Sequence, residues 1–368
     1  MLDKIRRLEK KYRLFRYIVY PCYLAYGWCF AFLCFCMRVF PVQEDKILFC
    51  SMKGRSCGGN PMCIAKELAG RGAGYKVVWI AGREAGKRLP PGMAHVGKGL
   101  LSQAYALATS GVWIDANTKP YGVLKRKNQL YIQTWHASYG LKRYGLDFPD
   151  RSELLSIRGD ARYVVTPHPT YDAFKMQDME KETARSLLKI QDDTLMLLFF
   201  GFVREYKGLK YLLKAMPYIK EKMPTVQLWV VGDFGEDKEG YLELIEKEDL
   251  ADNVVTVEGY IPDREVEKYF AATDLVVLPY ISATQSGIVQ IAYGFEKPVV
   301  VTDAGGLPDV VEDGKTGYIV HKENEQEIAE AVLKFSAVHE DWSRNIRENA
   351  AEFSWETMVG RIEKLAGL

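Results

Sequence analysis

From residue 46 onward, short apolar runs alternate with segments in which apolar residues recur every three or four positions. The runs have the length of strands and the spaced segments are amphipathic helices, so the pattern predicts parallel α/β layers. Strands are expected at 47–50, 76–81, 112–115, 130–134 and 161–166, with helices at 62–71 and 100–109. This first series predicts one doubly wound, Rossmann-like domain.

A second series begins near residue 180. The run at 195–200 is wholly apolar, which is typical of a strand buried on both faces. Further strands are expected at 226–231, 254–258, 275–278 and 298–302, and helices at 180–188, 206–222, 241–248, 263–272 and 287–295. The 206–222 helix is expected to break near Pro217, and residues 325–368 are expected to be helical.

The chain has 368 residues, a length typical of two domains. We predict an N-terminal domain over 45–170, a C-terminal domain over 171–350 and a final helix over 351–368 that packs back on the first domain. Two Rossmann-like domains facing a cleft are the expected architecture. Ligands of such sheets bind beyond the carboxyl ends of the strands, so those loops are where chemistry is expected.

Residues 1–44 form a separate basic and apolar segment. Residues 17–37 carry no formal charge, and the first 16 residues hold seven basic side chains against two acidic ones. A helix of twenty-one uncharged residues is long enough to cross a bilayer. Because a basic arm stays in the cytoplasm, a simple span would place the rest of the chain on the other side of the membrane. The tyrosines, Pro21 and Gly27 favour an interfacial helix whose basic arm attracts anionic lipid. The alternative is a terminal helix packed on the protein's own core.

The composition is that of an ordinary globular protein, with 48% hydrophobic and 26% charged residues and a net charge of +1. This near-neutral balance argues against a protein built to hold nucleic acid. The cysteines lack zinc-finger spacing and are typical of a reduced compartment, so no metal site is expected. All seven lie in the first 63 residues: Cys22, Cys29, Cys34, Cys36, Cys50, Cys57 and Cys63.

Two loops in the C-terminal half carry candidate chemistry. Gly201, Arg204 and Lys207 lie between a buried strand and a helix, where Arg204 can fork onto phosphate oxygens and Lys207 adds a point charge. The alternative is two solvated cations on a loop. Ser286 and Gly287 end a polar loop that opens another helix, and helix N-termini favour anions.

These loops, with the stretches VVGDF, GYIPDREVEKYF, GGLPDVVEDGKTGYIV and FSWETM, resemble the donor domain of family-4 glycosyltransferases of GT-B fold, over roughly residues 165–365. The resemblance implies a role for each motif in donor binding. It places Gly201, Arg204 and Lys207 on the donor diphosphate, Tyr260 and Ile261 on the base, and Ser286 and Gly287 near the donor sugar or phosphate.

One departure concerns the two glutamates, spaced E-x7-E, that many of these enzymes place on donor sugar and ribose. The corresponding stretch reads SATQSGIVQIAY and lacks both. Thr284, Gln285, Ser286 and Gln290 are the polar substitutes, and neutral groups bind a sugar more weakly than carboxylates do.

The N-terminal half contains a glycine-rich loop with Gly58, Gly59 and Asn60, and a histidine, His136, just past a predicted strand. The loop precedes a helix and is either an anion- or acceptor-binding loop or a tight connection. Histidine at the end of a strand can act as a base near neutral pH, although a lone histidine is often structural.

Residues 46–147, with SMKGRSCGGNP and QTWHASYGLK, resemble the N-terminal domain of the CDP-glycerol glycerophosphotransferase (teichoic-acid polymerase) family. The resemblance implies that His136 deprotonates the acceptor, with Lys142 nearby. The C-terminal motifs of that family, G-x-P-R-x-D and D-Y-S-S, are absent. His168, at the crossover between the domains, either faces the cleft or belongs to a rigid, proline-flanked hinge.

We therefore expect a glycosyltransferase at the cytoplasmic face of the cell membrane, peripheral or monotopic. It would move a sugar from a nucleotide-diphosphate sugar, its co-substrate, to a lipid-linked or cell-envelope glycan acceptor. We expect no other cofactor, no metal and no nucleic acid, and the family-4 resemblance implies retention at the anomeric carbon. The alternatives are polyol-phosphate transfer from CDP-glycerol and a non-catalytic member that binds nucleotide or glycan.

Overall fold

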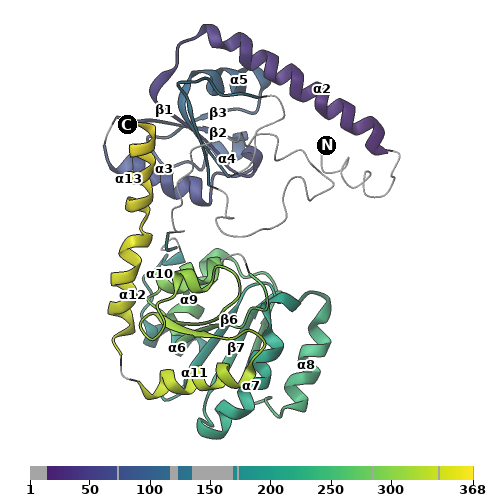
Figure 1. Ribbon diagram of the computed structural model, residues 1–368, viewed down its shortest axis with the longest axis vertical. Coiled ribbons are helices and arrows are strands. Elements are labelled where there is room, and N and C mark those ends of the chain that lie inside the picture. Colours follow the sequence, from purple (N-terminus) through teal and green to yellow (C-terminus); the bar gives the residue numbers. More distant parts are fainter. Residues whose placement is uncertain are drawn as a thin grey trace. The chain divides into compact units, whose positions relative to one another are not determined.

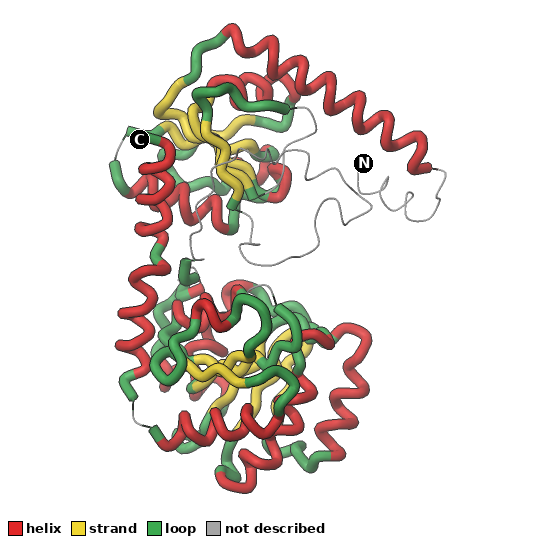
Figure 2. Tube along the Cα trace, in the orientation of Figure 1, coloured by secondary structure: helices red, strands yellow, loops and turns green. Residues whose placement is uncertain are grey.

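The computed structural model describes residues 15–72, 74–116, 123–134, 169–171, 174–283, 286–338 and 340–367. They divide into two compact units (Figures 1 and 2). The first contains the described residues up to 134 together with 358–367, and the second contains the described residues from 169 to 357. Each unit has its own parallel sheet, so the predicted fold class, two Rossmann-like α/β domains, is confirmed.

The first unit is built on a five-stranded parallel sheet in the order β3-β2-β1-β4-β5. Ile47, Leu48 and Phe49 are fully buried in its core, where Phe49 stacks on Trp79 with ring centroids 5.2 Å apart. The strands are β1 (Gln43–Cys50), β2 (Lys76–Ile80), β3 (Ala94–Val96), β4 (Ser110–Asp115) and β5 (Leu130–Gln133). The helices and 3-10 turns are α2 (Phe15–Cys36), η1 (Met37–Val39), η2 (Met52–Gly54), α3 (Asn60–Gly70), α4 (Arg83–Gly86) and α5 (Leu100–Thr109).

The apolar segment expected near the N-terminus forms α2, which packs against α5. Phe30 and Cys34 of α2 are buried in one cluster with Ala104 and Leu107 of α5. Within the described residues, no helix has both the length and the apolar character that crossing a membrane requires.

The second unit is built on a six-stranded parallel sheet in the order β11-β10-β9-β6-β7-β8. Its strands are β6 (Met196–Phe200), β7 (Gln227–Gly232), β8 (Val254–Glu258), β9 (Leu275–Leu278), β10 (Val299–Thr302) and β11 (Gly317–Val320). The helices are α6 (Lys181–Leu188), α7 (Leu209–Lys222), α8 (Lys238–Lys247), α9 (Asp263–Ala272), α10 (Gly287–Gly294), α11 (Glu325–Ala337), α12 (Trp342–Ala350) and α13 (Trp355–Ala366). Four 3-10 turns complete it: η6 (Glu205–Lys207), η7 (Gly235–Asp237), η8 (Pro308–Val310) and η9 (Ala351–Phe353).

Strand β6 is buried on both faces, as its continuous apolar run predicts. Its residues alternate between two hydrophobic clusters, with Met196, Leu198 and Phe200 in one and Leu197 and Phe199 in the other. Helices therefore cover both sides of this sheet.

The helix predicted to break near Pro217 continues through it, so this prediction is wrong. A proline inside a helix removes one hydrogen bond and costs about 3 kcal/mol. Leu212, Leu213, Met216 and Ile219 of α7 are all fully buried, and their burial outweighs that cost. The helical stretch expected over 325–368 is divided into α11, α12 and α13, and the strand expected at 161–166 lies outside the described residues.

The final helix, α13, begins in the second unit, but from Met358 onward it belongs to the first unit. There Glu363 accepts hydrogen bonds from Arg71 Nη1 at 2.6 Å and from the Tyr75 hydroxyl at 3.1 Å. These bonds, with the burial of Val359 and Ile362, hold the end of the chain on that unit.

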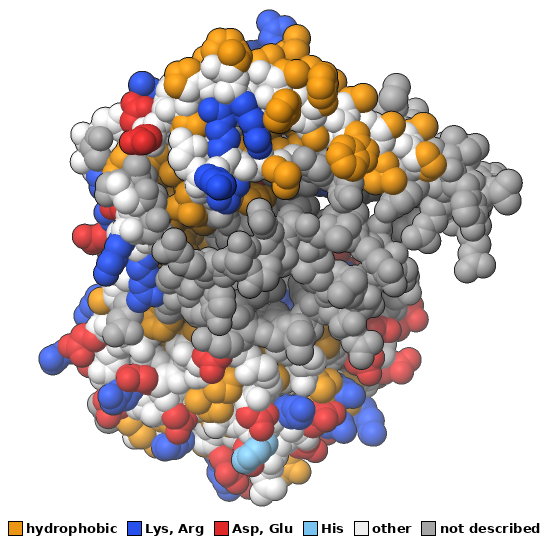
Figure 3. Space-filling model, turned by 45° about the horizontal axis from the view of Figure 1, so that its top comes forward, with side chains coloured by type: hydrophobic (Ala, Val, Ile, Leu, Met, Phe, Trp, Pro, Cys, Tyr) orange, Lys and Arg blue, Asp and Glu red, His pale blue; other side chains and the backbone are white. Residues whose placement is uncertain are grey.

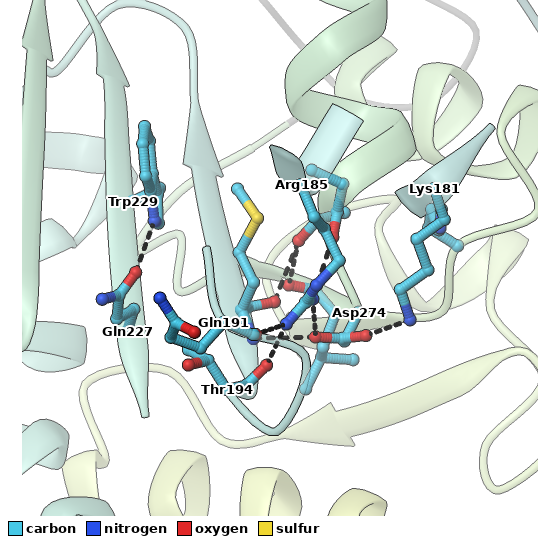
Figure 4. A network of polar contacts seen from close by, with 12 residues as sticks. Lys181, Arg185, Gln191, Thr194, Gln227, Trp229 and Asp274 are labelled. Atoms are coloured by element: carbon cyan, nitrogen blue, oxygen red, sulfur yellow. Dashed lines mark hydrogen bonds and ion pairs between the residues drawn. The ribbon is translucent and has the colours of Figure 1, made fainter. Parts of the chain in front are cut away.

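A buried arginine at the amino edge of the second sheet is paired with a carboxylate (Figure 4). Arg185 of α6 is 4% exposed and donates to Asp274 at 3.2 Å and to the carbonyl oxygens of Gln191 and Thr194, each at 2.6 Å. Asp274 also accepts from Lys181 at 2.5 Å. This network fixes α6 to the loops that precede β6 and β9.

Candidate functional site

The second sheet changes direction between β6 and β9. The chain runs from β6 outward through β7 to β8 and then returns to β9 on the other side of β6. Loops that leave two such strands diverge, and this switch point is where open parallel sheets bind ligands. Here the two loops are residues 201–208 after β6 and 279–286 after β9.

A glycine allows the two loops to meet. Gly208 has φ of +67° and precedes α7, and a Cβ at this position would lie 1.9 Å from the carbonyl oxygen of Pro279. The backbone N–H of Ile281 donates to the carbonyl oxygen of Tyr206 at 2.7 Å. The loops are therefore joined through their backbones, and a side chain at residue 208 would separate them.

Lys207 is buried at this junction. It is 8% exposed, and its ammonium lies 5.5 Å from the centroid of the Tyr280 ring. Gly201, with φ of +100°, approaches so closely that a Cβ there would lie 3.1 Å from Lys207 Nζ. Burial, and secondly the charge of Arg204, lower the pKa of Lys207 to about 8. Within the described part of the chain, no carboxylate forms an ion pair with this ammonium.

Arg204 lies just before η6. Its guanidinium carbon is 5.4 Å from the centroid of the Phe202 ring, and its Nη1 donates to the Val203 carbonyl oxygen at 2.9 Å. A Cβ on Gly235 would lie 2.4 Å from Nη1, so this glycine leaves room for the guanidinium. Arg204 and Lys207 therefore stand together without a counter-ion among the described residues, and a diphosphate could neutralise both.

The first turn of α10 closes the other loop. Ser286 is the N-cap: its Oγ accepts from the Ile288 N–H at 3.2 Å and lies 3.3 Å from the Tyr280 hydroxyl oxygen. Gly287, the first residue of α10, is exposed. The positive end of the helix is thus open to an anion, and Tyr280 contacts both this cap and Lys207.

The other residues expected to bind the donor sugar are Thr284, Gln285 and Gln290, and the structure describes Gln290. Gln290 of α10 is 3% exposed, and its Oε1 has no hydrogen-bond partner among the described residues. Thr284 and Gln285, expected in the same loop, lie outside the described residues.

Tyr260 and Ile261 follow β8, two strands from β6 and therefore about 10 Å away in the sheet. Tyr260 is 75% exposed, whereas Ile261 packs against the core. Glycines align the three strand ends: the Gly259 N–H donates to the Gly232 carbonyl oxygen at 3.1 Å, and a Cβ on Gly232 would lie 2.0 Å from the Gly201 carbonyl oxygen. Tyr260 thus lies on the same edge as the two cations but apart from them.

The first unit repeats this arrangement, with its switch point between β1 and β4. Gly58 and Gly59 lie in the loop after β1; a Cβ on Gly58 would meet nothing within 4 Å, and Gly59 has φ of +66°. Asn60 Nδ2 donates to the Thr134 carbonyl oxygen at 3.2 Å, just after β5. The glycine loop is thereby tied to the chain two residues before His136. His136, Lys142 and His168 themselves lie outside the described residues.

Asp115 is a further candidate that we did not expect from the sequence. It ends β4 and is 1% exposed, and its backbone carbonyl oxygen accepts from the Thr134 N–H at 2.8 Å. Burial, followed by the charge and hydrogen bond of Asp115, raises the pKa of Tyr131. A carboxylate that ends an otherwise apolar strand is a sequence signal for such a residue. In the described ranges, no three His, Cys, Asp or Glu side chains gather as metal ligands.

Comparison with known families assigns the two halves differently. Residues 194–337 match the family described as "Glycosyl transferases group 1". Residues 32–174 match the family described as "CDP-Glycerol:Poly(glycerophosphate) glycerophosphotransferase". Each match covers less than half of the chain, and both resemblances expected from the sequence are confirmed.

Solved structures similar to this chain have the GT-B fold of glycosyltransferases. Sucrose-phosphate synthase from Thermosynechococcus elongatus is 19% identical, with a TM-score of 0.62 over 87% of this chain and 98% of that one. A glycosyltransferase from Rickettsia africae is 15% identical, with a TM-score of 0.64 over 87% and 97%. Anabaena HepE, solved with UDP-glucose, is 18% identical, with a TM-score of 0.60 over 88% and 100%. The chain has this fold.

Curated proteins similar to this chain include glycosyltransferases. D-inositol 3-phosphate glycosyltransferase of Paenarthrobacter aurescens is 29% identical over 231 residues, 60% of this chain and 56% of that protein. The uncharacterized glycosyltransferase MJ1607 of Methanocaldococcus jannaschii is 28% identical over 187 residues, 49% of this chain and 46% of that protein. The chain thus spans about half the length of these relatives.

Proposed function

We propose that this protein is a glycosyltransferase that moves a sugar from a nucleotide-diphosphate sugar to a lipid-linked or cell-envelope glycan acceptor. The observation that carries this proposal is the pair of cations, Arg204 and Lys207, at the switch point of the unit that matches the group 1 family. The similarity of the fold to HepE, solved with UDP-glucose, supports a donor of the same class.

The proposed chemistry uses these cations on the leaving group. As the bond between the anomeric carbon and the diphosphate oxygen breaks, negative charge grows on the diphosphate. Lys207 acts from a buried position, where electrostatic interactions are stronger than in water, and Arg204 and the start of α10 add positive charge beside it. We propose that no metal ion is needed and that the anomeric configuration is retained, as the family-4 resemblance implies.

On the acceptor side, we propose His136 as the base that takes the proton from the attacking hydroxyl. Gly58, Gly59 and Asn60 bind the acceptor in the loop after β1, with Lys142 and His168 as further candidates. Ser286 and Gln290, which replace carboxylates by a hydroxyl and an amide, bind the donor sugar with Thr284 and Gln285.

The second candidate function is transfer of a polyol phosphate from CDP-glycerol. The match of residues 32–174 to the glycerophosphotransferase family favours it. We rank it second because the donor is bound by the other unit, whose match is to glycosyltransferases. A non-catalytic role in binding nucleotide or glycan is the third candidate, motivated by the missing glutamates.

A thermal-shift panel of UDP, UDP-sugars and CDP-glycerol tests donor binding. A ligand at one hundred times its Kd stabilises the folded state by about 2.7 kcal/mol, which raises Tm by several degrees. We expect this rise with UDP-sugars in the wild type and its loss in an Arg204→Ala, Lys207→Met variant. No rise with any nucleotide-diphosphate sugar would contradict the proposal, and a rise with CDP-glycerol alone would favour polyol-phosphate transfer.

A further inference from the structure

Helix α2 has apolar residues on two opposite sides, and only one side is covered. Phe30 and Cys34 are 2% and 6% exposed because they pack against α5. The opposite stripe follows helical spacing of three or four residues: Trp28, Phe32 and Phe35 are 60%, 65% and 65% exposed. Large apolar side chains gathered on a surface indicate an interaction site.

The uncovered surface extends beyond α2. Val39 of η1 is 81% exposed and continues the stripe, and the adjacent Phe40 lies edge-on to Tyr105 of α5 with ring centroids 5.1 Å apart. Leu101, one turn before Tyr105, is 60% exposed, and Leu124 is 69% exposed. We call these residues the apolar face: Trp28, Phe32, Phe35, Val39, Phe40, Leu101, Tyr105 and Leu124. Figure 3 shows hydrophobic side chains gathered over this unit, with Lys and Arg side chains among them.

Arginines hold the parts of the apolar face together. Arg38 donates to the Leu124 carbonyl oxygen at 3.0 Å, and its guanidinium carbon lies 5.6 Å from the Phe35 ring centroid. Arg126 donates to the Phe40 carbonyl oxygen at 2.8 Å. The face is therefore a fixed surface built from α2, η1, α5 and the segment before β5.

The charge around the apolar face has one sign. The stretches that supply the face, 26–40, 100–109 and 123–127, contain no Asp or Glu. They contain four Lys and Arg residues: Arg38, Lys125, Arg126 and Lys127. A second copy on the same face would bring these cations against one another, whereas anionic headgroups would neutralise them.

We propose that the apolar face docks on a bilayer that contains anionic lipid, with α2 lying in the plane of the interface. Its aromatic stripe enters the boundary between headgroups and acyl chains, and the surrounding cations bind the headgroups. This inference goes beyond the proposed function and does not depend on it, because every residue involved belongs to the first unit, whereas the proposed donor cations belong to the second.

Co-sedimentation of the full chain with vesicles tests this docking. We expect binding to phosphatidylcholine vesicles that contain about one-third phosphatidylglycerol, and binding at least about tenfold weaker to phosphatidylcholine alone. Raising the salt from about 0.1 M to about 1 M, which shortens the Debye length from about 10 Å to about 3 Å, should also release the protein. Equal binding to both vesicles, or to neither, would overturn the proposal.

Matched variants locate the surface. A Phe32→Ser, Phe35→Ser variant should bind the anionic vesicles at least about tenfold more weakly, since two aromatic side chains no longer enter the interface. Leu187→Ser, which removes a side chain that is 60% exposed on α6, should bind as the wild type does. Wild-type binding by the Phe32, Phe35 variant would overturn the proposal.

A charge variant tests the same surface even if the Phe32→Ser, Phe35→Ser variant fails to fold. Lys125→Glu, Lys127→Glu should weaken binding to anionic vesicles while the melting temperature stays unchanged. Unaltered binding would contradict the role of the cations. A different outcome is a dimeric wild type and a monomeric Phe32→Ser, Phe35→Ser variant, with neither protein binding vesicles. That outcome would assign the face to a second copy and overturn lipid docking.

Discussion

The ammonium of Lys207 lies over the ring of Tyr280, 5.5 Å from its centroid, where the loops after β6 and β9 meet. The aromatic face offers partial compensation for a buried cation, but no carboxylate among the described residues neutralises it. At the opposite edge of the same sheet, Arg185 is as buried and fully paired with Asp274. Lys207 therefore combines a buried ammonium without a paired carboxylate with a position at the edge where ligands of such sheets bind.

Replacing Lys207 by methionine should weaken donor binding without lowering the stability of the free protein. We expect Lys207→Met to weaken binding of UDP-glucose by at least about tenfold, because a charge-assisted contact to the diphosphate contributes about 1.5–3 kcal/mol. The free variant should be as stable as the wild type or more so, because an ammonium no longer has to be buried. Titration calorimetry and urea unfolding measure the two effects.

Lys297→Met is the matched control for that experiment. Burial also lowers the pKa of Lys297 to about 8, but its ammonium donates to the Ala271 carbonyl oxygen at 3.0 Å. Its substitution should leave UDP-glucose binding unchanged. If both variants lost binding equally, the assignment of the site to Lys207 would be wrong.

Donor affinity should depend on pH through Lys207. The diphosphate binds the protonated amine, whose pKa is about 8 in the free protein, so affinity should fall above pH 8 by up to about tenfold per unit. A Lys207→Arg variant should lack this decline, because arginine stays charged. Calorimetric titrations with UDP-glucose between about pH 7 and 9.5 measure it, and a flat wild-type profile would be the contrary result.

Stability should change in the opposite direction. The unfolded chain holds Lys207 near its ordinary pKa of 10.5, so between pH 8 and 10.5 it binds more protons than the folded chain does. Stability of the free protein therefore gains from rising pH in this range. Because Lys297 adds the same dependence, donor binding rather than unfolding is the readout that isolates Lys207.

Gly208 should tolerate no side chain. A Cβ there would lie 1.9 Å from the Pro279 carbonyl oxygen, and the φ of +67° adds strain, so Gly208→Ala should push the two loops apart. We expect a loss of at least about 1 kcal/mol of stability together with weaker UDP-glucose binding. Gly240→Ala in α8, where a Cβ meets nothing within 4 Å, should be neutral or stabilising. Equal effects of the two alanines would refute the loop contact.

The buried pair of Arg185 and Asp274 should dominate local stability. Asp274→Ala leaves Arg185 buried with its charge uncompensated, which costs about 3–5 kcal/mol in comparable pairs. Lys181→Ala should cost less than about 1 kcal/mol, because the Lys181 side chain is 43% exposed. Urea unfolding of both variants measures the difference. A loss of stability in Asp274→Ala no larger than that in Lys181→Ala would contradict this prediction.

The strands of both sheets could be predicted because their apolar runs must be buried, whatever the rest of the fold does. The run at β6 predicts a strand covered on both faces, and the structure places its residues in two clusters. The prediction of a helix break near Pro217 is wrong because the cost of a proline is local, whereas the burial that outweighs it depends on residues distant in the sequence.

The site was only partly predictable for the same reason. Arg204 and Lys207 can be recognised as candidate phosphate ligands from their own loop. The burial of Lys207 depends on Tyr280 and on the contact of Gly208 with Pro279, which join segments far apart in the sequence. The burial that makes Asp115 a candidate site residue could not be recognised from the sequence, because it depends on the assembled sheet and not on the neighbours of this residue in the chain.

The nucleotide released during turnover tests the central claim most directly. Sugar transfer breaks the bond from the anomeric carbon to the diphosphate and releases a nucleoside diphosphate, whereas polyol-phosphate transfer breaks the diphosphate itself and releases a nucleoside monophosphate. With extracted lipid-linked acceptors, we predict UDP from a UDP-sugar, at a rate that falls at least about a hundredfold in the Arg204→Ala, Lys207→Met variant. Release of CMP from CDP-glycerol, with none of UDP from any UDP-sugar, would contradict the account.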